Sequence, residues 1–261
     1  MKVLSLAGME ANDILSATKV VLDFSVAGTT DLKTAAETLM SVSTAFNMGA
    51  GGFREVSDVI SKAAAVSMTS VESFSSAMKT ASVINAQYGV SLKDTATGIA
   101  ALSQLGIQGT AAGTAMRNMY ADLSGRSAQV AKVLRQQGIE LRDVTTGGFK
   151  PLINVVAELD EKFKKFDAIS QKNLMQALLS ERGAKPIVEM LRMINTESTA
   201  MSGSLTNALE TARAEMDKSA GFAAETAARM SQSVDNQFKA VKATLGATFL
   251  EIFQEISPAL S

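Results

Sequence analysis

Apolar and small residues recur every three or four positions along most of the chain, which is the spacing of one face of a helix. The first proline is Pro151, so no proline interrupts a helix before that position. Met40, Met78 and Met116 follow one another at intervals of 38 residues, and a run of small residues precedes each methionine. A period of this length suits a helix–turn–helix unit. The pattern predicts an all-α chain in which residues 1–126 form stacked helical hairpins, as in an α-solenoid or a helical bundle.

Helix starts and helix ends have signals of their own. Thr69-x-x-Glu72 and Ser91-x-x-Asp94 resemble capping boxes, in which side chains accept hydrogen bonds from the amides of a helix start. Glycine ends a helix well because it adopts the left-handed conformation without a Cβ clash. The sequence predicts helix ends at four glycines, namely Gly28, Gly89, Gly106 and Gly138.

Residues 127–200 have a different pattern, which predicts a helical subdomain with a turn-rich link. A helix over 128–137 is followed by a link over 139–150, whose Thr-Thr-Gly-Gly sequence suits a short hairpin. Pro151 is well placed at a first helical position. The helix after it has an apolar face made of Leu152, Val155, Leu159, Phe163 and Phe166. Its other face carries acid–lysine pairs at the i,i+4 spacing that stabilises helices, namely Glu158/Lys162, Asp160/Lys164 and Glu161/Lys165.

Residues 201–261 are typical of a long helix or of a coiled-coil-like segment. Apolar residues there step by three or four positions, in the order Val234, Phe238, Val241, Leu245, Phe249, Ile252 and Ile256. A stripe of this kind is close to a coiled-coil seam. It needs a partner, which is either the body of the protein or another copy of the chain. We therefore take Phe238, Leu245 and Ile252 as candidate interaction residues.

Composition argues against ordinary enzyme chemistry. The chain has no cysteine and no histidine, so it lacks a thiolate nucleophile, the commonest general base and the commonest metal ligand. The net charge is −1 with both signs interspersed, and no basic stripe indicates a nucleic-acid-binding surface. No apolar run approaches the ~18 residues of a membrane span. We predict no catalytic residue, no cofactor and no metal site.

One glycine-dense stretch, Gly106-x-x-Gly109-x-x-x-Gly113, invites a ligand-binding interpretation. A phosphate loop needs a Lys-Ser/Thr pair after the last glycine, but Thr114 and Ala115 stand there. The spacing of the last two glycines resembles a membrane dimer motif, in a setting that is too polar and too short. We expect a turn and then a helix start that lets another helix approach closely. Gly106, Gly109 and Gly113 are therefore candidate packing residues.

The same region carries a family resemblance. A helix ends at the turn Gly106-Ile107, the segment Ala112–Arg117 follows, and a further helix leads to Gly138-Ile139. In this order the residues resemble the core region of bacteriophage tail tape measure proteins. The resemblance extends over Leu6–Ile194, although Leu178–Ala184 lacks the Phe-Gly pair of the corresponding family segment.

The resemblance implies a structural role without a catalytic site. Tape measure proteins occupy the lumen of the tail tube, set tail length during assembly and leave the tube ahead of the DNA. The partners implied are the tail tube protein, tail assembly chaperones and other copies of the chain in a homo-oligomer. No sequence-specific nucleic acid is implied, and transient contact with the host membrane stays open. The implied location is the phage tail in the virion, and the host cytoplasm during assembly.

Two other functions fit the same residues. A generic α-helical interaction scaffold would be a monomer with a concave binding face. A membrane-active helical protein would insert its apolar helices and make liposomes leak. Members of the resembled family are generally much longer, so we expect this chain to be a fragment of a longer protein or the product of a truncated gene.

Overall fold

The structure is a computed structural model that describes residues 11–126, 132, 134–136, 138–143, 147–167, 169–173 and 204–235. Within these residues the regular elements are helices, together with one isolated antiparallel bridge between Arg142 and Phe149. The prediction of an all-α chain is confirmed.

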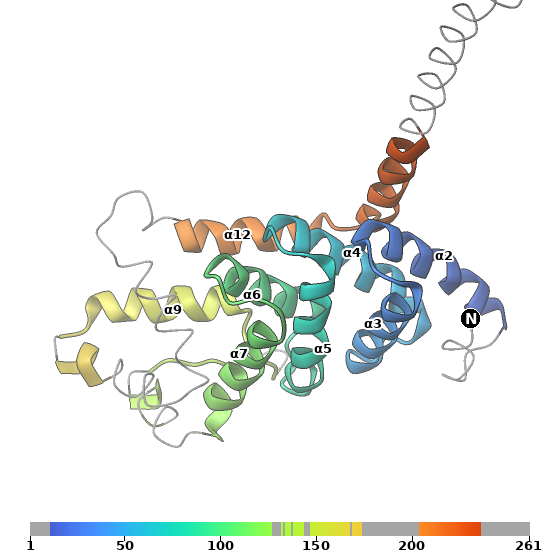
Figure 1. Ribbon diagram of the computed structural model, residues 1–261. Coiled ribbons are helices and arrows are strands. Elements are labelled where there is room, and N and C mark those ends of the chain that lie inside the picture. The colour runs from blue at the N-terminus through green and yellow to red at the C-terminus, as the bar shows by residue number, and fades with distance from the viewer. Residues whose placement is uncertain are drawn as a thin grey trace, which may run out of the picture.

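Three helical hairpins follow one another along the chain and stack side by side (Figure 1). They are α2 (Ala11–Gly28) with α3 (Leu32–Ala45), α4 (Phe53–Val66) with α5 (Val71–Gln87), and α6 (Leu92–Gln104) with α7 (Gly109–Ala121). Helices α2, α4 and α6 form one layer, and α3, α5 and α7 form the other. A 3-10 turn, η1 (Ala50–Gly52), precedes α4, and a π-helical segment, η2 (Asp122–Arg126), follows α7.

The 38-residue interval in the sequence is the step from one hairpin to the next. Met40, Met78 and Met116 lie on α3, α5 and α7, which occupy equivalent places in successive hairpins. Met78 and Met116 are completely buried, whereas Met40 is half-buried on the first hairpin. Each hairpin thus carries a methionine at an equivalent place in its second helix.

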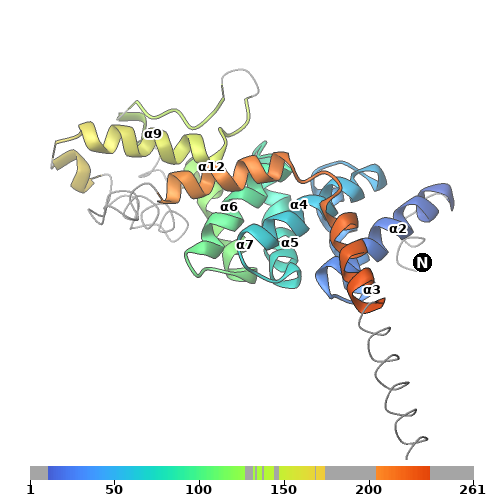
Figure 2. The ribbon, with the colours of Figure 1, turned by 90° about the horizontal axis from the view of Figure 1, so that it is seen from above.

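Further helices cover one side of this stack. Helix α9 (Leu152–Lys165) lies against α6, and α12 (Ser204–Asp217) crosses α4 and α6 and also touches α9. A helix over residues 222–235, here called the outgoing helix, follows α12 after a sharp change of direction and projects from the body (Figures 1 and 2). Helix α12 therefore folds back on the hairpins, and the outgoing helix does not continue its line.

The predicted helix ends are observed with one shift. Gly89, Gly106 and Gly138 follow their helices with φ of 75°, 82° and 61°. Gly28 is the last residue of α2, but the left-handed residue is its neighbour Thr29, with φ of 48°. The turn at that end is therefore made one residue later than predicted.

The helix starts also agree with the sequence to within one residue. Ser91 is the N-cap of α6, as predicted, and its hydroxyl accepts a hydrogen bond from the Asp94 N–H at 3.1 Å. The start predicted at Thr69 was wrong by one position. Ser70 is the N-cap of α5, and its hydroxyl accepts from the Ser73 N–H at 3.1 Å. Serine and threonine both cap helices, with serine the better of the two, so a Thr-Ser pair does not by itself define the first residue of a helix.

The link before α9 contains the predicted short hairpin. The Asp143 N–H donates to the Gly148 carbonyl and the Lys150 N–H donates to the Leu141 carbonyl, each at 2.9 Å. Helix α9 begins at Leu152, one residue after the predicted start, because the Pro151 carbonyl accepts the first helical hydrogen bond.

The two faces of α9 follow the predicted pattern. Leu152, Val155 and Leu159 are buried. On the opposite face Asp160 pairs with Lys164 at 2.7 Å and Glu161 with Lys165 at 2.5 Å. The two members of the third predicted pair contact residues further away in the sequence. Glu158 pairs with Lys150 at 2.7 Å, and Lys162 donates to the Gly138 carbonyl at 2.5 Å.

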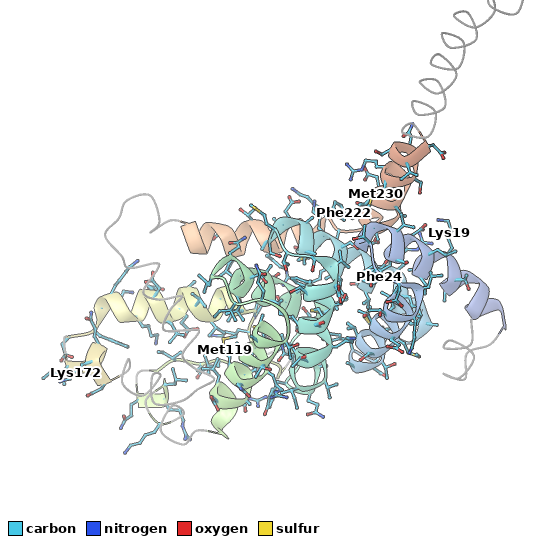
Figure 3. All side chains as sticks on the ribbon, in the orientation of Figure 1. Lys19, Phe24, Met119, Lys172, Phe222 and Met230 are labelled. Atoms are coloured by element: carbon cyan, nitrogen blue, oxygen red, sulfur yellow. The ribbon has the colours of Figure 1, made fainter. Side chains whose placement is uncertain are left out.

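The core combines alanine and methionine with a few larger anchors. The largest fully buried side chains are Tyr120, Phe24, Phe74, Leu39, Ile60, Met78, Ile99, Leu102, Met116, Met119 and Leu152. Figure 3 shows Phe24 on α2 in the first hairpin and Met119 on α7 in the third. Methionine fills the irregular gaps that small residues leave, because its side chain is unbranched and flexible.

Tyr120 gives a prediction about this core. The centres of its ring and the Phe149 ring lie 5.4 Å apart in an edge-to-face arrangement, and its buried hydroxyl has no hydrogen-bond partner among the described residues. Burial also raises the pKa of the phenol above its ordinary range. We expect Tyr120→Phe to raise the free energy of unfolding by about 1 kcal/mol in urea denaturation, because an unsatisfied buried hydroxyl is lost. Tyr88→Phe is the control, since Tyr88 is only half-buried, and it should be neutral. A destabilised Tyr120→Phe would reveal a hydrogen bond to this hydroxyl.

Candidate functional site

The glycine stretch singled out in the sequence is not gathered into one ligand site. Gly106 lies in the turn after α6, where an added Cβ would meet no atom of the described residues within 4 Å. Gly109 begins α7. Gly113 is buried where α7 meets α5: an added Cβ would lie 2.7 Å from the Cβ of Thr80, and closer still to the Ala77 carbonyl oxygen. Helix α7 therefore approaches the backbone of α5 at Gly113.

The seam predicted for the C-terminal region is described only at its start. Phe238, Leu245 and Ile252 lie outside the described residues. Val234, the first residue of the seam, is 50% exposed on the outgoing helix. Association through this stripe stays a prediction.

Ion pairs and apolar contacts together hold α12 against the hairpins. In the described part of the chain, ion pairs join it to α4 and α6 through Lys62–Glu215 at 2.5 Å, Lys93–Asp217 at 3.3 Å and Arg213–Asp94. The side chains are partly exposed to water, so each pair stabilises the fold by only about 0.2–1 kcal/mol. Leu209, Ala212 and Met216 of α12 are completely buried. Helix α12 is thus held on α4 and α6 by residues that lie more than a hundred positions earlier in the sequence.

Asp58 of α4 holds the start of the outgoing helix. Asp58 is only 3% exposed, and its carboxylate accepts hydrogen bonds from the N–H groups of Gly221 at 2.7 Å and Ala223 at 3.0 Å. The first N–H groups of a helix have no carbonyl partner within the helix. A negative charge at this position also suits the positive end of the helix dipole.

Lys62 lies one turn further along α4 and contacts both sides of the bend between α12 and the outgoing helix. Its ammonium pairs with Glu215 of α12 and lies 4.8 Å from the centre of the Phe222 ring. In Figure 3 Phe222 lies where the outgoing helix leaves the body, and Met230 lies further along that helix. We call Asp58, Lys62, Glu215 and Phe222 the clamp.

The clamp predicts a dependence of stability on pH. The hydrogen bond from Lys62, and then its charge, lower the pKa of Glu215. A carboxyl with a lowered pKa in the folded chain stabilises the fold above its unfolded pKa, and this contribution is lost as pH falls. We expect the native chain to be more stable than Lys62→Met at pH 7, and the difference to shrink as pH falls below about 4.5. Urea denaturation at several pH values measures it.

The control for this prediction is Lys172→Met. Lys172 is exposed at the far end of the body (Figure 3), so its replacement should leave the pH dependence of stability unchanged. A difference between the native chain and Lys62→Met that stays constant down to pH 3 would contradict a role for the Glu215 charge.

No sequence pattern predicts the clamp as a whole, although α4 carries a signal. Asp58 lies among Val56, Val59 and Ile60, which are completely buried. A carboxylate in such surroundings requires hydrogen-bond donors, because burial of an unpaired charge is costly. The donors are 163 and 165 positions away in the sequence, so no local pattern identifies them.

The described residues offer little for catalysis. Among them no group of three His, Cys, Asp or Glu side chains could hold a metal ion. A groove of about 600 Å³ between α3 and α5 has Glu37 as its charged side chain, beside Met40 and Val83. None of the described helices combines the length and the apolar character that crossing a bilayer requires. What the clamp can do physically is hold a helix and direct it away from the body.

Comparison with known proteins agrees with a structural interpretation. A family described as phage-related minor tail protein matches residues 1–180. The chain is 25% identical, over its whole length, to the tape measure protein of Pneumococcus phage Dp-1, and covers 22% of that protein. Over 99% of its length it is 23% identical to the probable tape measure protein of Escherichia phage P2, and covers 31% of that protein. The chain thus spans less than a third of either relative, and no solved structure matches it.

Proposed function

The chain belongs to the phage-related minor tail protein family, and on this premise we propose that it is the folded helical region of a tape measure protein, which sets tail length during assembly. The resemblance noted in the sequence to tape measure proteins is thereby confirmed. The chain is a component of the phage tail. Its proposed role is structural, with occupancy of the tail tube lumen before DNA ejection.

The geometry supports different roles for the stacked hairpins and for the projecting helix in such a protein. A helix rises 1.5 Å per residue, so a projecting helix converts chain length into distance. Stacked hairpins do not, because each helix reverses the direction of the one before it. The observation that carries the proposal is the outgoing helix, which is anchored at Asp58 and exposed from Ser231 to Asp235. The hairpins act as a base, and the helical chain beyond the clamp acts as the ruler.

The domain division follows the same logic. We propose a base of hairpins over 1–126, a helical subdomain over 127–200 and a coiled-coil-like segment over 201–261. Helix α12 is the part of the last segment that docks on the base. The remainder of that segment is then available for association with other molecules.

The proposed partners are the tail tube protein, the tail assembly chaperones and other copies of the chain. Self-association is expected through the apolar stripe that includes Phe238, Leu245 and Ile252. Size-exclusion chromatography with light scattering on the 261-residue chain should detect oligomers, and replacement of these three residues by aspartate should abolish them. A native chain that is monomeric at high concentration would contradict this part of the proposal.

A pair of insertions in the phage gene tests the ruler itself. A 28-residue helical insertion after Asp235 should lengthen the tail by about 40 Å, at 1.5 Å per residue. The same number of flexible residues inserted at Met68, an 86% exposed residue in the turn after α4, should leave tail length unchanged. Electron microscopy of assembled tails measures both. Unchanged tails after the first insertion would refute the ruler, and longer tails after the second would refute a compact base.

A further inference from the structure

The outgoing helix begins without a capping side chain of its own. Gly221 is its N-cap, because the Gly221 carbonyl accepts the hydrogen bond from the Glu225 N–H at 3.0 Å. Helices usually have Ser, Thr, Asp or Asn at this position, whose side chain accepts from the second or third N–H group of the helix. Glycine cannot do so, and Asp58 supplies the missing carboxylate from α4.

The bend is fixed from its other side as well. Glu215 in the last turn of α12 pairs with Lys62, and Lys62 also lies over the ring of Phe222. Asp58 and Lys62 are four positions apart, so they lie on one face of α4. One short stretch of α4 therefore contacts the residues immediately before and after the bend.

The outgoing helix stays in contact with the body for a short distance beyond the clamp. Ala223 and Ala227 are buried at 1% and 4% exposure and Met230 is half-buried, whereas residues 231–235 are all exposed. The two fully buried residues are small and bury little apolar area, so they hold the helix only weakly by themselves. The polar contacts at its start add the hydrogen bonds and the charge pairing that such apolar contacts lack.

We propose that Asp58 is a positioning residue, a helix cap supplied by α4 that fixes the starting point and the direction of the outgoing helix, with Lys62 holding the bend beside it. In the proposed function, on which the significance of this role rests, Asp58 sets the residue at which the base ends and the ruler begins. The contact itself can be tested on the isolated chain, whatever the outcome of the tail-length experiment.

The absence of cysteine makes a distance measurement direct, because two introduced cysteines carry the only spin labels. The first pair, Glu55→Cys and Gln232→Cys, joins α4 to the outgoing helix at exposed positions. The second pair, Glu55→Cys and Ala111→Cys, joins α4 to α7 within the body. Pulsed electron paramagnetic resonance gives the distribution of distances for each pair.

Asp58→Ala should at least double the width of the 55–232 distribution and leave the 55–111 distribution unchanged. The amides of Gly221 and Ala223 should exchange with solvent about tenfold faster, because they lose their acceptor. Asp58→Asn keeps one carbonyl acceptor and should give an intermediate width. Asp160→Ala, which removes an acid from an ion pair within α9, is the matched control and should change neither distribution.

Two outcomes would overturn the proposal. An unchanged 55–232 distribution in Asp58→Ala would mean that other contacts direct the helix. Broadening of both distributions, in Asp58→Ala and in Asp58→Asn alike, would mean that Asp58 stabilises the body and has no specific positioning role.

Discussion

We expect Gly89→Ala to lower the free energy of unfolding by about 3 kcal/mol, the largest effect of the substitutions considered. Gly89 has a φ of 75°, a left-handed conformation that costs a residue with a Cβ about 1–2 kcal/mol. An added Cβ would also lie 2.8 Å from the Cα of Gly148. Backbone atoms cannot move aside as the end of a side chain can, so crowding adds about 1–3 kcal/mol.

Gly106→Ala is the matched control. Gly106 has nearly the same φ, 82°, but in the described part of the chain no atom lies within 4 Å of an added Cβ. We expect this substitution to cost about 1 kcal/mol, from conformational strain alone. Urea denaturation of both variants isolates the cost of the contact with Gly148. Equal losses would mean that the link before α9 does not lie tightly against the turn after α5.

The approach of Gly89 and Gly148 has a structural consequence. The neighbouring Phe149 N–H donates to the Tyr88 carbonyl at 3.2 Å, and the centres of the Phe149 and Tyr88 rings lie 5.8 Å apart in an edge-to-face arrangement. These contacts attach the link before α9 to the hairpins. We therefore expect faster amide exchange in α9 of Gly89→Ala than in α9 of Gly106→Ala.

The second large effect is expected at Gly113, one of the candidate packing residues. Gly113→Ala should lower the free energy of unfolding by about 2 kcal/mol, because crowding costs about 3 kcal/mol and the better helix propensity of alanine returns about 1 kcal/mol. The new Cβ would meet the carbonyl of Ala77, which is part of the α5 backbone. The two helices could accept it only by moving apart.

Substitutions at two other glycines serve as comparisons for Gly113→Ala. Gly51→Ala should be neutral within about 0.5 kcal/mol, since an added Cβ there meets no atom of the described residues within 4 Å. Gly98→Ala should fall between the two, because the new Cβ would meet the ends of the Met116 and Leu152 side chains, which can shift more easily than backbone atoms. Urea denaturation measures all three variants. If Gly113→Ala is as stable as Gly51→Ala, α7 does not depend on close approach to α5.

Sequence patterns predicted the local elements with small errors. The helix after Pro151, the cap at Ser91 and the ends at Gly89 and Gly106 were all found, because each depends on residues within one or two turns. The errors at Thr69 and Gly28 were single-residue shifts: Ser70 offers the same hydroxyl acceptor as Thr69, and Thr29 takes the left-handed conformation that was expected at Gly28. Local signals therefore locate an element better than they locate its first or last residue.

The candidate site was predicted much less well. The sequence drew attention to Gly113, and the structure places it between α5 and α7. No sequence pattern indicated the hydrogen bonds that Asp58 accepts from Gly221 and Ala223, or the contact of Gly89 with Gly148. Such pairs have no characteristic spacing, because the chain between their members can have any length.

By itself, the sequence determined the all-α class, the repeating hairpin and the family, since helix periodicity, capping and a family's residue pattern are all expressed within short stretches of chain. Only the tertiary structure decided that α12 folds back across α4 and α6, that Asp58 caps a helix 163 positions further on, and where the outgoing helix leaves the body. The physical reason is that a buried carboxylate must find donors wherever packing brings them. Which helix supplies those donors depends on how all the apolar faces are buried together.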